Sequence, residues 1–267
     1  MCYKNVLLFI VTTVAIFETS FGTENNATQP QKKQELTFEK TMEEMIISAK
    51  TGKFVRQCSC DEQEPCLKDI LTDFQACFET CWEQKNSGKI APKPEVLKQC
   101  FESRLGLVNQ FISCINTTAK TCYPTKSGPQ IEYVSVQRIV AAGEQRMAAQ
   151  ASGFERAMGP ANKPVVQAAE ELASCMKDCF LDKDAGQKCF GKSGCQPKLA
   201  EDLVGPVIKR CAWRIGWKTE ASQMCDCFLD AGVMSLKPYC QLFRASAQGP
   251  KKTVQSTKPA TAPKPKK

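Results

Sequence analysis

Cysteine constrains this chain more than any other residue. The sequence holds 17 cysteines in 267 residues, and all of them except Cys2 lie between Cys58 and Cys240. Secreted chains use an even set of cysteines as disulfides, whereas cytosolic chains keep them reduced. We therefore predict eight disulfides and no free thiol in the mature chain. The first group of disulfide cysteines is Cys58, Cys60, Cys66, Cys77, Cys81, Cys100, Cys114 and Cys122, and the second is Cys175, Cys179, Cys189, Cys195, Cys211, Cys225, Cys227 and Cys240.

A zinc cluster is the alternative use for so many cysteines. Such clusters need Cys-x-x-Cys pairs, and the sequence contains none. The chain also has no histidine, which excludes zinc sites that use imidazole and nucleophiles activated by a histidine base. Neither a Gly-rich phosphate loop, nor a nucleophile elbow, nor an HExxH motif occurs. We therefore expect no metal, no cofactor and no enzymatic activity.

Residues 1–22 have the pattern of a secretory signal peptide. Lys4 precedes an apolar run from Val6 to Phe17, and the small residues Ser20 and Gly22 follow it. A helix of this run rises about 18 Å, which is short of the ~30 Å hydrocarbon core of a bilayer. We predict cleavage after Gly22, loss of Cys2 with the signal, no transmembrane segment and a secreted, extracellular mature chain.

Shifts in composition divide the chain into six segments. Apolar residues recur at steps of three and four from Leu36 to Ala49, which predicts an amphipathic helix. A second helix is predicted from Val136 to the Gly159-Pro160 pair, and a third begins near Pro164. The segments are a signal peptide (1–22), a polar leader with an amphipathic helix (23–52), a first cysteine-rich helical module (53–128), a helical connector (129–172), a second cysteine-rich helical module (173–243) and a disordered basic tail rich in lysine and proline (244–267).

Cysteine spacing suggests that the two modules are related. The run Cys77-Phe-Glu-Thr-Cys81-Trp resembles the run Cys175-Met-Lys-Asp-Cys179-Phe, and coincidence among many cysteines is the alternative explanation. Cysteines at i and i+4 share one helix face and reach a facing helix rather than each other. The separation of 14 residues between Cys100 and Cys114 recurs between Cys211 and Cys225. Because 14 residues make close to four turns, each pair is expected on a single helix, about 21 Å apart.

Strand patterns are scarce in this sequence. We therefore predict an all-α fold, a disulfide-stapled helical bundle in which two related eight-cysteine modules are joined by amphipathic helices. The pairing of the cysteines cannot be read from the sequence, because eight cysteines already allow 105 pairings.

Two kinds of surface site are predicted. The sequons Asn26-Ala-Thr and Asn116-Thr-Thr are N-glycosylation candidates. The basic tail has no acidic residue, and flexible lysines of this kind bind polyanions, although a merely solubilising tail is the alternative. No aromatic residue lies among these lysines, so nucleic acid is not expected, and a sulfated glycan is the extracellular polyanion that fits. The polyanion-binding candidates are Lys251, Lys252, Lys258, Lys264, Lys266 and Lys267.

One stretch resembles a known family. The run Met224-Cys-Asp-Cys-Phe-Leu-Asp-Ala-Gly-Val-Met-Ser-Leu-Lys-Pro-Tyr-Cys240, which follows the Cys175-x3-Cys179 helix, resembles the cysteine-rich domain of nematode chondroitin proteoglycan 4-type secreted proteins. The resemblance covers Cys58 to Cys240. It implies a secreted, disulfide-bonded, non-enzymatic extracellular protein. It does not extend to glycan attachment, because the Ser-Gly pairs of this chain have a poor acidic context.

Three hypotheses for function follow. The first is an extracellular structural or interaction protein, associated with matrix or glycosaminoglycan, whose partner is an extracellular protein or a sulfated glycan. The second is a secreted helical carrier that encloses a lipid or another small apolar ligand. The third is a secreted effector that binds a host protein. Bound lipid would favour the second hypothesis, and retention on heparin or chondroitin sulfate would favour the first.

Overall fold

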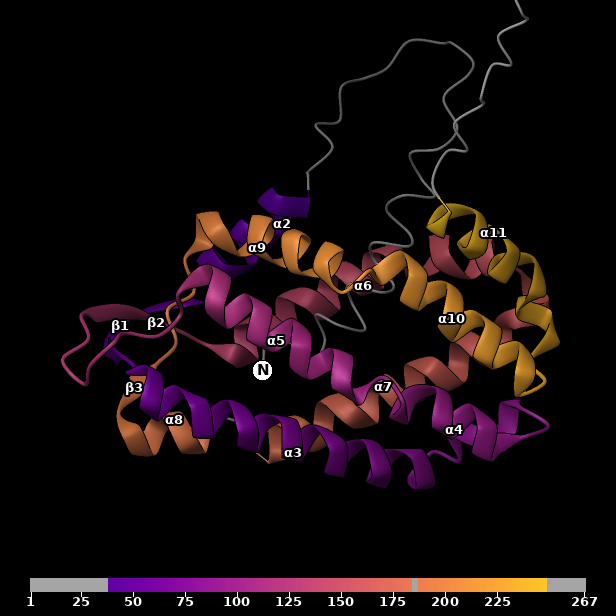
Figure 1. Cartoon of the computed structure of the whole chain (residues 1–267), viewed down its shortest axis with the longest axis horizontal. Helices are drawn as coiled ribbons and strands as arrows, with labels where there is room; N and C mark the ends of the chain where they lie inside the picture. The colour runs from indigo at the N-terminus through magenta and orange to yellow at the C-terminus, as the bar shows by residue number, and fades with distance from the viewer. Residues whose placement is uncertain (1–37, 184–186, 249–267) are drawn as a thin grey trace, which may run out of the picture.

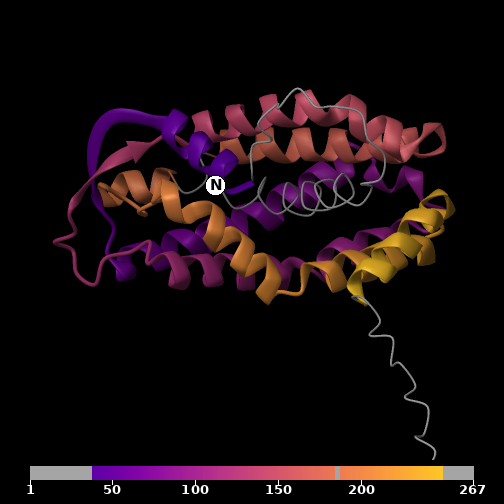
Figure 2. The same cartoon turned by 90° about the horizontal axis from the view of Figure 1, so that it is seen from above.

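The computed structural model describes residues 38–183 and 187–248, and it is predominantly helical (Figure 1). The predicted all-α, disulfide-stapled fold is confirmed. The signal peptide, the polar leader up to Thr37 and residues 249–267 lie outside the described residues. The long helices run roughly along the long axis of the molecule (Figures 1 and 2). The helices are α2 (Phe38–Ala49), α3 (Cys60–Gln84), α4 (Pro94–Glu102), α5 (Leu105–Ala119), α6 (Val136–Met158), α7 (Lys163–Asp182), α8 (Gln187–Ser193), α9 (Glu201–Arg214), α10 (Trp217–Asp230) and α11 (Lys237–Ala247), with short 3-10 turns η1 (Ser87–Ile90), η2 (Pro160–Asn162) and η3 (Met234–Leu236).

Local sequence signals explain where several helices begin and end. Helix α3 starts at a capping box, in which Ser59 and Glu62 each accept a backbone N–H of the other. Helix α6 ends where Gly159 takes a positive φ of 67°, and Pro164 lies in the first turn of α7. The helices predicted from residue 36, from residue 136 and near residue 164 are therefore confirmed as α2, α6 and α7. Helix α11 continues to Ala247, so residues 244–247 are helical and do not belong to a disordered tail.

Six of the eight disulfides join the first cysteine group to the second. Antiparallel pairing of the two halves of the chain places α3 against α7 and α8, and places the α4–α5 pair against the α9–α10 pair. The cross-group disulfides are Cys58–Cys195, Cys66–Cys189, Cys77–Cys179, Cys81–Cys175, Cys100–Cys227 and Cys114–Cys211, and the disulfides within a group are Cys60–Cys122 and Cys225–Cys240.

The expectation that Cys100 and Cys114 share one helix is wrong. Helix α4 ends at Glu102 and α5 begins at Leu105, and the side chain of Arg104 donates to the carbonyl of Cys100 at the end of α4 (3.0 Å). Cys211 and Cys225 also lie on two separate helices. Helix α9 ends at Arg214, and Gly216, with φ 66°, turns the chain into α10. A left-handed residue cannot continue a right-handed helix, so the chain bends there.

The pairing between α3 and α7 is reciprocal. Cys77, the first cysteine of its i, i+4 pair, bonds Cys179, the second cysteine of the other pair, while Cys81 bonds Cys175. Two structural units related by a two-fold axis make reciprocal contacts of this kind. Helices α3 and α7 also end three residues after Cys81 and Cys179, with the same backbone cap. Counterpart positions can therefore be named in the two halves of the bundle, although the predicted module boundaries stay a prediction.

A small sheet closes one end of the bundle (Figure 1). Its order is β2 (Gln130–Val134), β1 (Lys50–Gln57) and β3 (Cys195–Gln196), with β1 antiparallel to β2 and parallel to β3. These three strands were not predicted from the sequence, because their strand signals are weak. Gly128, just before β2, is required by packing, because a Cβ there would lie 2.3 Å from the carbonyl oxygen of Gln57.

The core consists of three apolar clusters. The first lies where α2, α5 and α9 meet, the second lies between α3, α4 and the α10–α11 hairpin, and the third lies between α3 and α7. Disulfides are part of this core, since Cys77, Cys81, Cys100 and Cys211 are fully buried. None of the described helices combines the length and the apolar character needed to span a bilayer.

Candidate functional site

The residues predicted as sites are found in very different places. All sixteen predicted disulfide cysteines are paired in the structure. Asn26 lies outside the described residues. So do all of the predicted polyanion-binding residues, which are Lys251, Lys252, Lys258, Lys264, Lys266 and Lys267. Any binding site among the described residues therefore consists of side chains other than these lysines.

Asn116, the second sequon, lies in the last turn of α5 and is half-buried. Its Oδ1 accepts hydrogen bonds from Gln63 Nε2 and Thr121 Oγ1, both at 2.5 Å, and both of those side chains are buried. Its Nδ2, the atom that carries a glycan in a used sequon, forms no hydrogen bond within residues 38–183 and 187–248. Glycosylation of Asn116 stays a prediction, and its amide oxygen has a separate structural role.

A basic and aromatic surface lies on the outer side of α9 and the start of α10. We call it the α9 surface. Trp213 is its most prominent member, because 61% of this large apolar side chain is exposed. Helical spacing places Arg210 and Arg214 in one exposed row and places Lys209 and Trp213 in the adjacent row. Its members are Lys209, Arg210, Trp213, Arg214 and Lys218.

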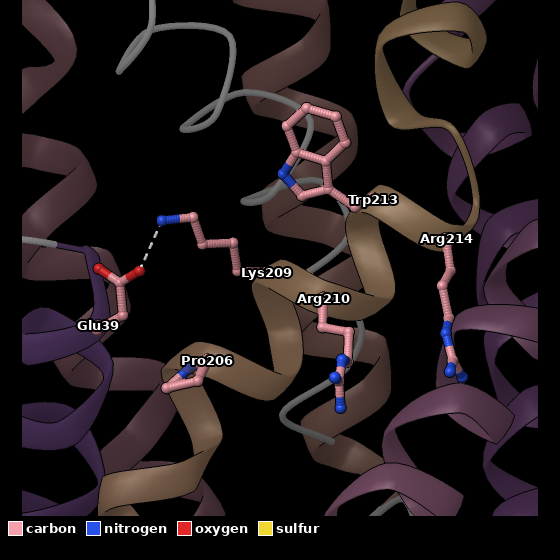
Figure 3. Close-up of a pocket in the computed structure, with 6 residues that line it drawn as sticks. All are labelled: Glu39, Pro206, Lys209, Arg210, Trp213 and Arg214. Atoms are coloured by element: carbon pink, nitrogen blue, oxygen red, sulfur yellow. Dashed lines mark hydrogen bonds and ion pairs between the residues drawn. The ribbon is translucent and has the colours of Figure 1, made fainter.

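The α9 surface borders an open groove of about 520 Å³ (Figure 3). Glu39 from α2 lines one side of it, and Pro206 and the side chains of α9 line the rest. The Nζ atom of Lys209 pairs with Glu39 at 2.8 Å. The Nζ atom of Lys218 lies 5.7 Å from the ring centre of Trp213 and 5.5 Å from that of Trp217. These contacts hold two of the cations in place.

Arg210 and Arg214 have a different environment. No carboxylate of the described residues lies within ion-pair distance of either guanidinium. Like charges at i and i+4 on a helix destabilise it by about 0.2–0.5 kcal/mol. The pair is therefore a local cost to stability, and the hydrogen bond from Arg214 Nη1 to Cys114 Sγ is a weak one, at 4.0 Å. Two exposed guanidinium groups on one helix face can bind a pair of anionic groups.

The counterpart helix shows that packing does not require this surface. Aligning Cys100 with Cys211 places Gln99, Glu102 and Ser103 of α4 at the positions of Arg210, Trp213 and Arg214. The counterpart of Lys209 is Lys98, whose Nζ lies 2.7 Å from Glu79 and 3.8 Å from both Glu83 and Glu102. The positions of Arg210 and Arg214 thus carry the uncharged Gln99 and Ser103 in the other half of the bundle, and the position of Trp213 carries Glu102. Because α4 and α9 occupy equivalent places in the bundle, packing does not determine which side chains they expose here. The residues exposed on α9 can therefore serve binding.

The sequence contained a signal for the α9 surface that composition did not reveal. Residues 209–218 read KRCAWRIGWK, which brings together four basic residues and two of the three tryptophans of the chain. Only the structure shows which residues of this run lie on the surface, because Cys211 and Trp217 are buried whereas Trp213 is exposed.

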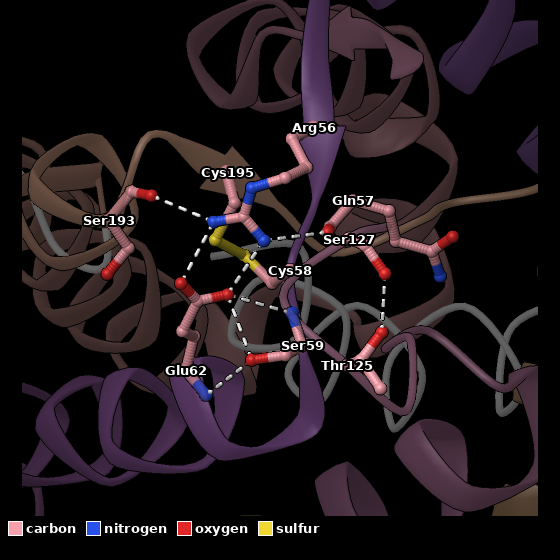
Figure 4. Close-up of polar contacts among 9 residues, drawn as sticks. All are labelled: Arg56, Gln57, Cys58, Ser59, Glu62, Thr125, Ser127, Ser193 and Cys195. Atoms are coloured by element: carbon pink, nitrogen blue, oxygen red, sulfur yellow. Dashed lines mark hydrogen bonds and ion pairs between the residues drawn. A yellow bond between two sulfur atoms is a disulfide. The ribbon is translucent and has the colours of Figure 1, made fainter. Parts of the chain in front are cut away.

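A second charged network is structural. Arg56 binds Glu62 through two bonds, Nη1 to Oε2 at 2.8 Å and Nη2 to Oε1 at 2.9 Å, beside the Cys58–Cys195 disulfide (Figure 4). The same carboxylate accepts from the backbone N–H and the hydroxyl of Ser59. The Arg56 bonds, followed by those of Ser59, lower the pKa of Glu62 from 4.5 to about 2. A carboxylate held in this way caps α3 and fastens the helix to the sheet.

Comparison with protein-family models, with curated proteins and with solved structures found no match for this chain. The resemblance to chondroitin proteoglycan 4-type proteins therefore stays a prediction. Among the described residues, no cluster of three or more potential ligands is arranged to hold a metal ion.

Proposed function

We propose that this chain is a secreted, non-enzymatic extracellular protein with a structural or interaction role, and that a sulfated glycan is its partner. The observation that carries the proposal is the complete disulfide framework. Every one of the sixteen cysteines from Cys58 to Cys240 is cross-linked, and such a set persists only in an oxidising compartment. The predicted signal peptide supports the same assignment, as does the resemblance of the cysteine pattern to that of chondroitin proteoglycan 4-type proteins.

The cross-linking pattern suits a protein that must persist outside the cell. Because six disulfides join the two halves of the chain, a single cut in the cysteine-free connector leaves both pieces covalently attached. Each disulfide that closes a long loop also removes about 3–5 kcal/mol of unfolded-state entropy in the chain-entropy model, although the terms do not add. A durable scaffold with an exposed binding surface is what matrix association requires.

A binding role is favoured over a carrier role by the contents of the interior. The three apolar clusters are filled by side chains and disulfides, among them the fully buried Phe111. The groove beside the α9 surface is open rather than enclosed, so it leaves much of a ligand in contact with water. An apolar ligand would gain little by entering it. Lipid seen in native mass spectrometry of the secreted protein would nevertheless support a carrier and count against this proposal.

The test begins with expression of the full chain in a cell that secretes it. We expect the protein in the medium, with its amino terminus at Thr23, and retained on heparin and chondroitin sulfate columns until salt is raised. A second form that ends at residue 248 measures the contribution of the segment beyond α11. Protein that stays in the cytosol with reduced thiols, or that passes both columns unretained, would contradict the proposal.

A further inference from the structure

We infer that the folded part of the chain carries its own binding site for a sulfated glycan, on the α9 surface and separate from the lysines beyond residue 248. In this site Arg210 and Arg214 bind sulfate groups, and the indole of Trp213 packs against a sugar ring. The inference rests on the proposed function, which supplies the class of partner, and it names the residues that bind it.

The arginine pair supplies the anion-binding element. Both side chains are exposed, both lie on one helix face one turn apart, and neither has a carboxylate partner in the described residues. A guanidinium binds a sulfate or a phosphate through two parallel N–H bonds, which a lysine ammonium cannot do. One turn of helix separates the two groups by about 5–6 Å at Cβ. Neighbouring sulfates on a linear glycan can therefore contact both arginines at once.

Trp213 makes the surface more than a patch of charge. Trp213, which is 61% exposed, presents a large and rigid aromatic face to the solvent beside the two arginines. The C–H groups on one side of a pyranose ring form a flat apolar surface that packs against an aromatic face. Lys218 lies over the same indole and adds a cation next to the bound ring. A charged and partly apolar sugar matches this combination.

The charge balance of the site is positive. Glu39 is the acidic residue that lines the groove and its carboxylate pairs with Lys209, so the lining residues Arg210 and Arg214 make the site positive. The counterpart helix α4 carries Gln99, Glu102 and Ser103 at the positions of the three side chains that we assign to binding. The inference is therefore specific to one half of the bundle and predicts one site per chain.

The experiment compares variants of the full secreted chain by calorimetry with a sulfated heparin oligosaccharide and by retention on chondroitin sulfate. The double variant Arg210→Gln/Arg214→Gln removes the anion-binding pair. The matched control, Lys188→Gln/Lys192→Gln, removes the same charge from α8, where both lysines are also exposed. Each variant must show no free thiol and an unchanged circular dichroism spectrum before binding is compared.

We expect the arginine variant to bind on the order of tenfold more weakly or worse, which corresponds to about 1.4 kcal/mol. Its affinity should also depend less on salt, with the slope of log K against log salt reduced by about 2. Trp213→Ala should weaken binding with an unchanged slope, because an indole carries no charge. The α8 control should bind within about twofold of the wild type.

Several outcomes would overturn the inference. If the arginine variant binds as the wild type does and only the form ending at residue 248 loses binding, the glycan contacts lie beyond α11, and the proposed function stands without this site. If desulfated oligosaccharide, or a single-stranded DNA of equal charge, binds equally well, recognition of a sulfated sugar is wrong. If the wild type binds no glycan at all, the proposed function fails together with the site.

Discussion

Replacing Gly205 with alanine tests how closely α2 and α9 pack beneath the candidate surface. Gly205 is buried in α9, and a Cβ built on it would lie 2.6 Å from the Cα of Glu39 and 3.1 Å from the carbonyl oxygen of Glu39. Both atoms belong to the backbone of α2, so no side chain can rotate away. The methyl group must push the two helices apart and move Glu39 away from Lys209.

The magnitude follows from two opposing effects. Overpacking a core contact costs typically about 1–3 kcal/mol, and a backbone clash of this size belongs at the upper end of that range. Alanine is a better helix former than glycine by about 1 kcal/mol, which offsets part of the loss. We therefore expect Gly205→Ala to lower the free energy of unfolding by about 2 kcal/mol. For a domain of this size the Tm should fall by about 4–8 °C.

Gly153→Ala is the matched control. Gly153 lies in α6 and is exposed, and a Cβ there meets no atom within 4 Å. Only the gain in helix propensity remains, so this variant should be more stable by about 0.5–1 kcal/mol. Denaturant unfolding with disulfides intact, together with calorimetric Tm values, measures both variants. A Gly205→Ala protein as stable as Gly153→Ala would refute the close approach of α2 and α9.

Three further predictions concern the disulfides, the Arg56–Glu62 pair and Asn116. Alkylation of the unreduced mature protein should label no cysteine, and alkylation after reduction should add 16 tags by mass spectrometry; any label before reduction counts against full pairing. The pKa of Glu62 is lowered from 4.5 to about 2 in the folded state, so its contribution to stability is present above pH 4.5 and is lost as the pH falls toward 2. Arg56→Gln should therefore lower the Tm at neutral pH, and its difference from the wild type should shrink over that window; a constant difference would show that the pair does not hold the carboxylate. Thr118→Ala destroys the Asn116 sequon but keeps the hydrogen bonds of Asn116. Asn116→Ala removes the acceptor of one N–H of Gln63 and of the Thr121 hydroxyl, which then keep, among the described residues, only their bond to each other, so it should be less stable than Thr118→Ala by about 1–3 kcal/mol in denaturant unfolding. Thr118→Ser, which keeps the sequon, controls for the glycan. Equal stability of the two alanine variants would show that Asn116 has no structural role.

The parts of the fold that the sequence predicted are those set by local patterns. Helices α2, α6 and α7 were predicted because the signals that set them are local. Apolar spacing, Gly159 and Pro164 each affect only the residues next to them in the chain. The break between Cys100 and Cys114 was missed, because Ser103 and Arg104 are not strong helix breakers. The three strands were missed for a related reason. Strand β1 reads KTGKFVRQ, which has no clear alternation, and its pairing partners lie far away in the sequence.

The candidate site depends on long-range packing, which a sequence does not display. Whether Trp213 or Trp217 is exposed is decided by which side of the α9–α10 pair contacts α5 and α2. Disulfide pairing is also a property of the assembled bundle. The i, i+4 pairs on α3 and α7 were each expected to reach a facing helix, and only the structure shows that they reach each other.

A disulfide map of the secreted protein tests the central claim, that two antiparallel halves of one chain are cross-linked to each other. Cleavage after Glu79 separates Cys77 from Cys81, and cleavage after Lys177 separates Cys175 from Cys179. Digestion without reduction, followed by mass spectrometry, should recover peptides that link Cys77 to Cys179 and Cys81 to Cys175. Peptides that instead link Cys77 to Cys175, or that confine every disulfide to its own group of eight cysteines, would contradict the account.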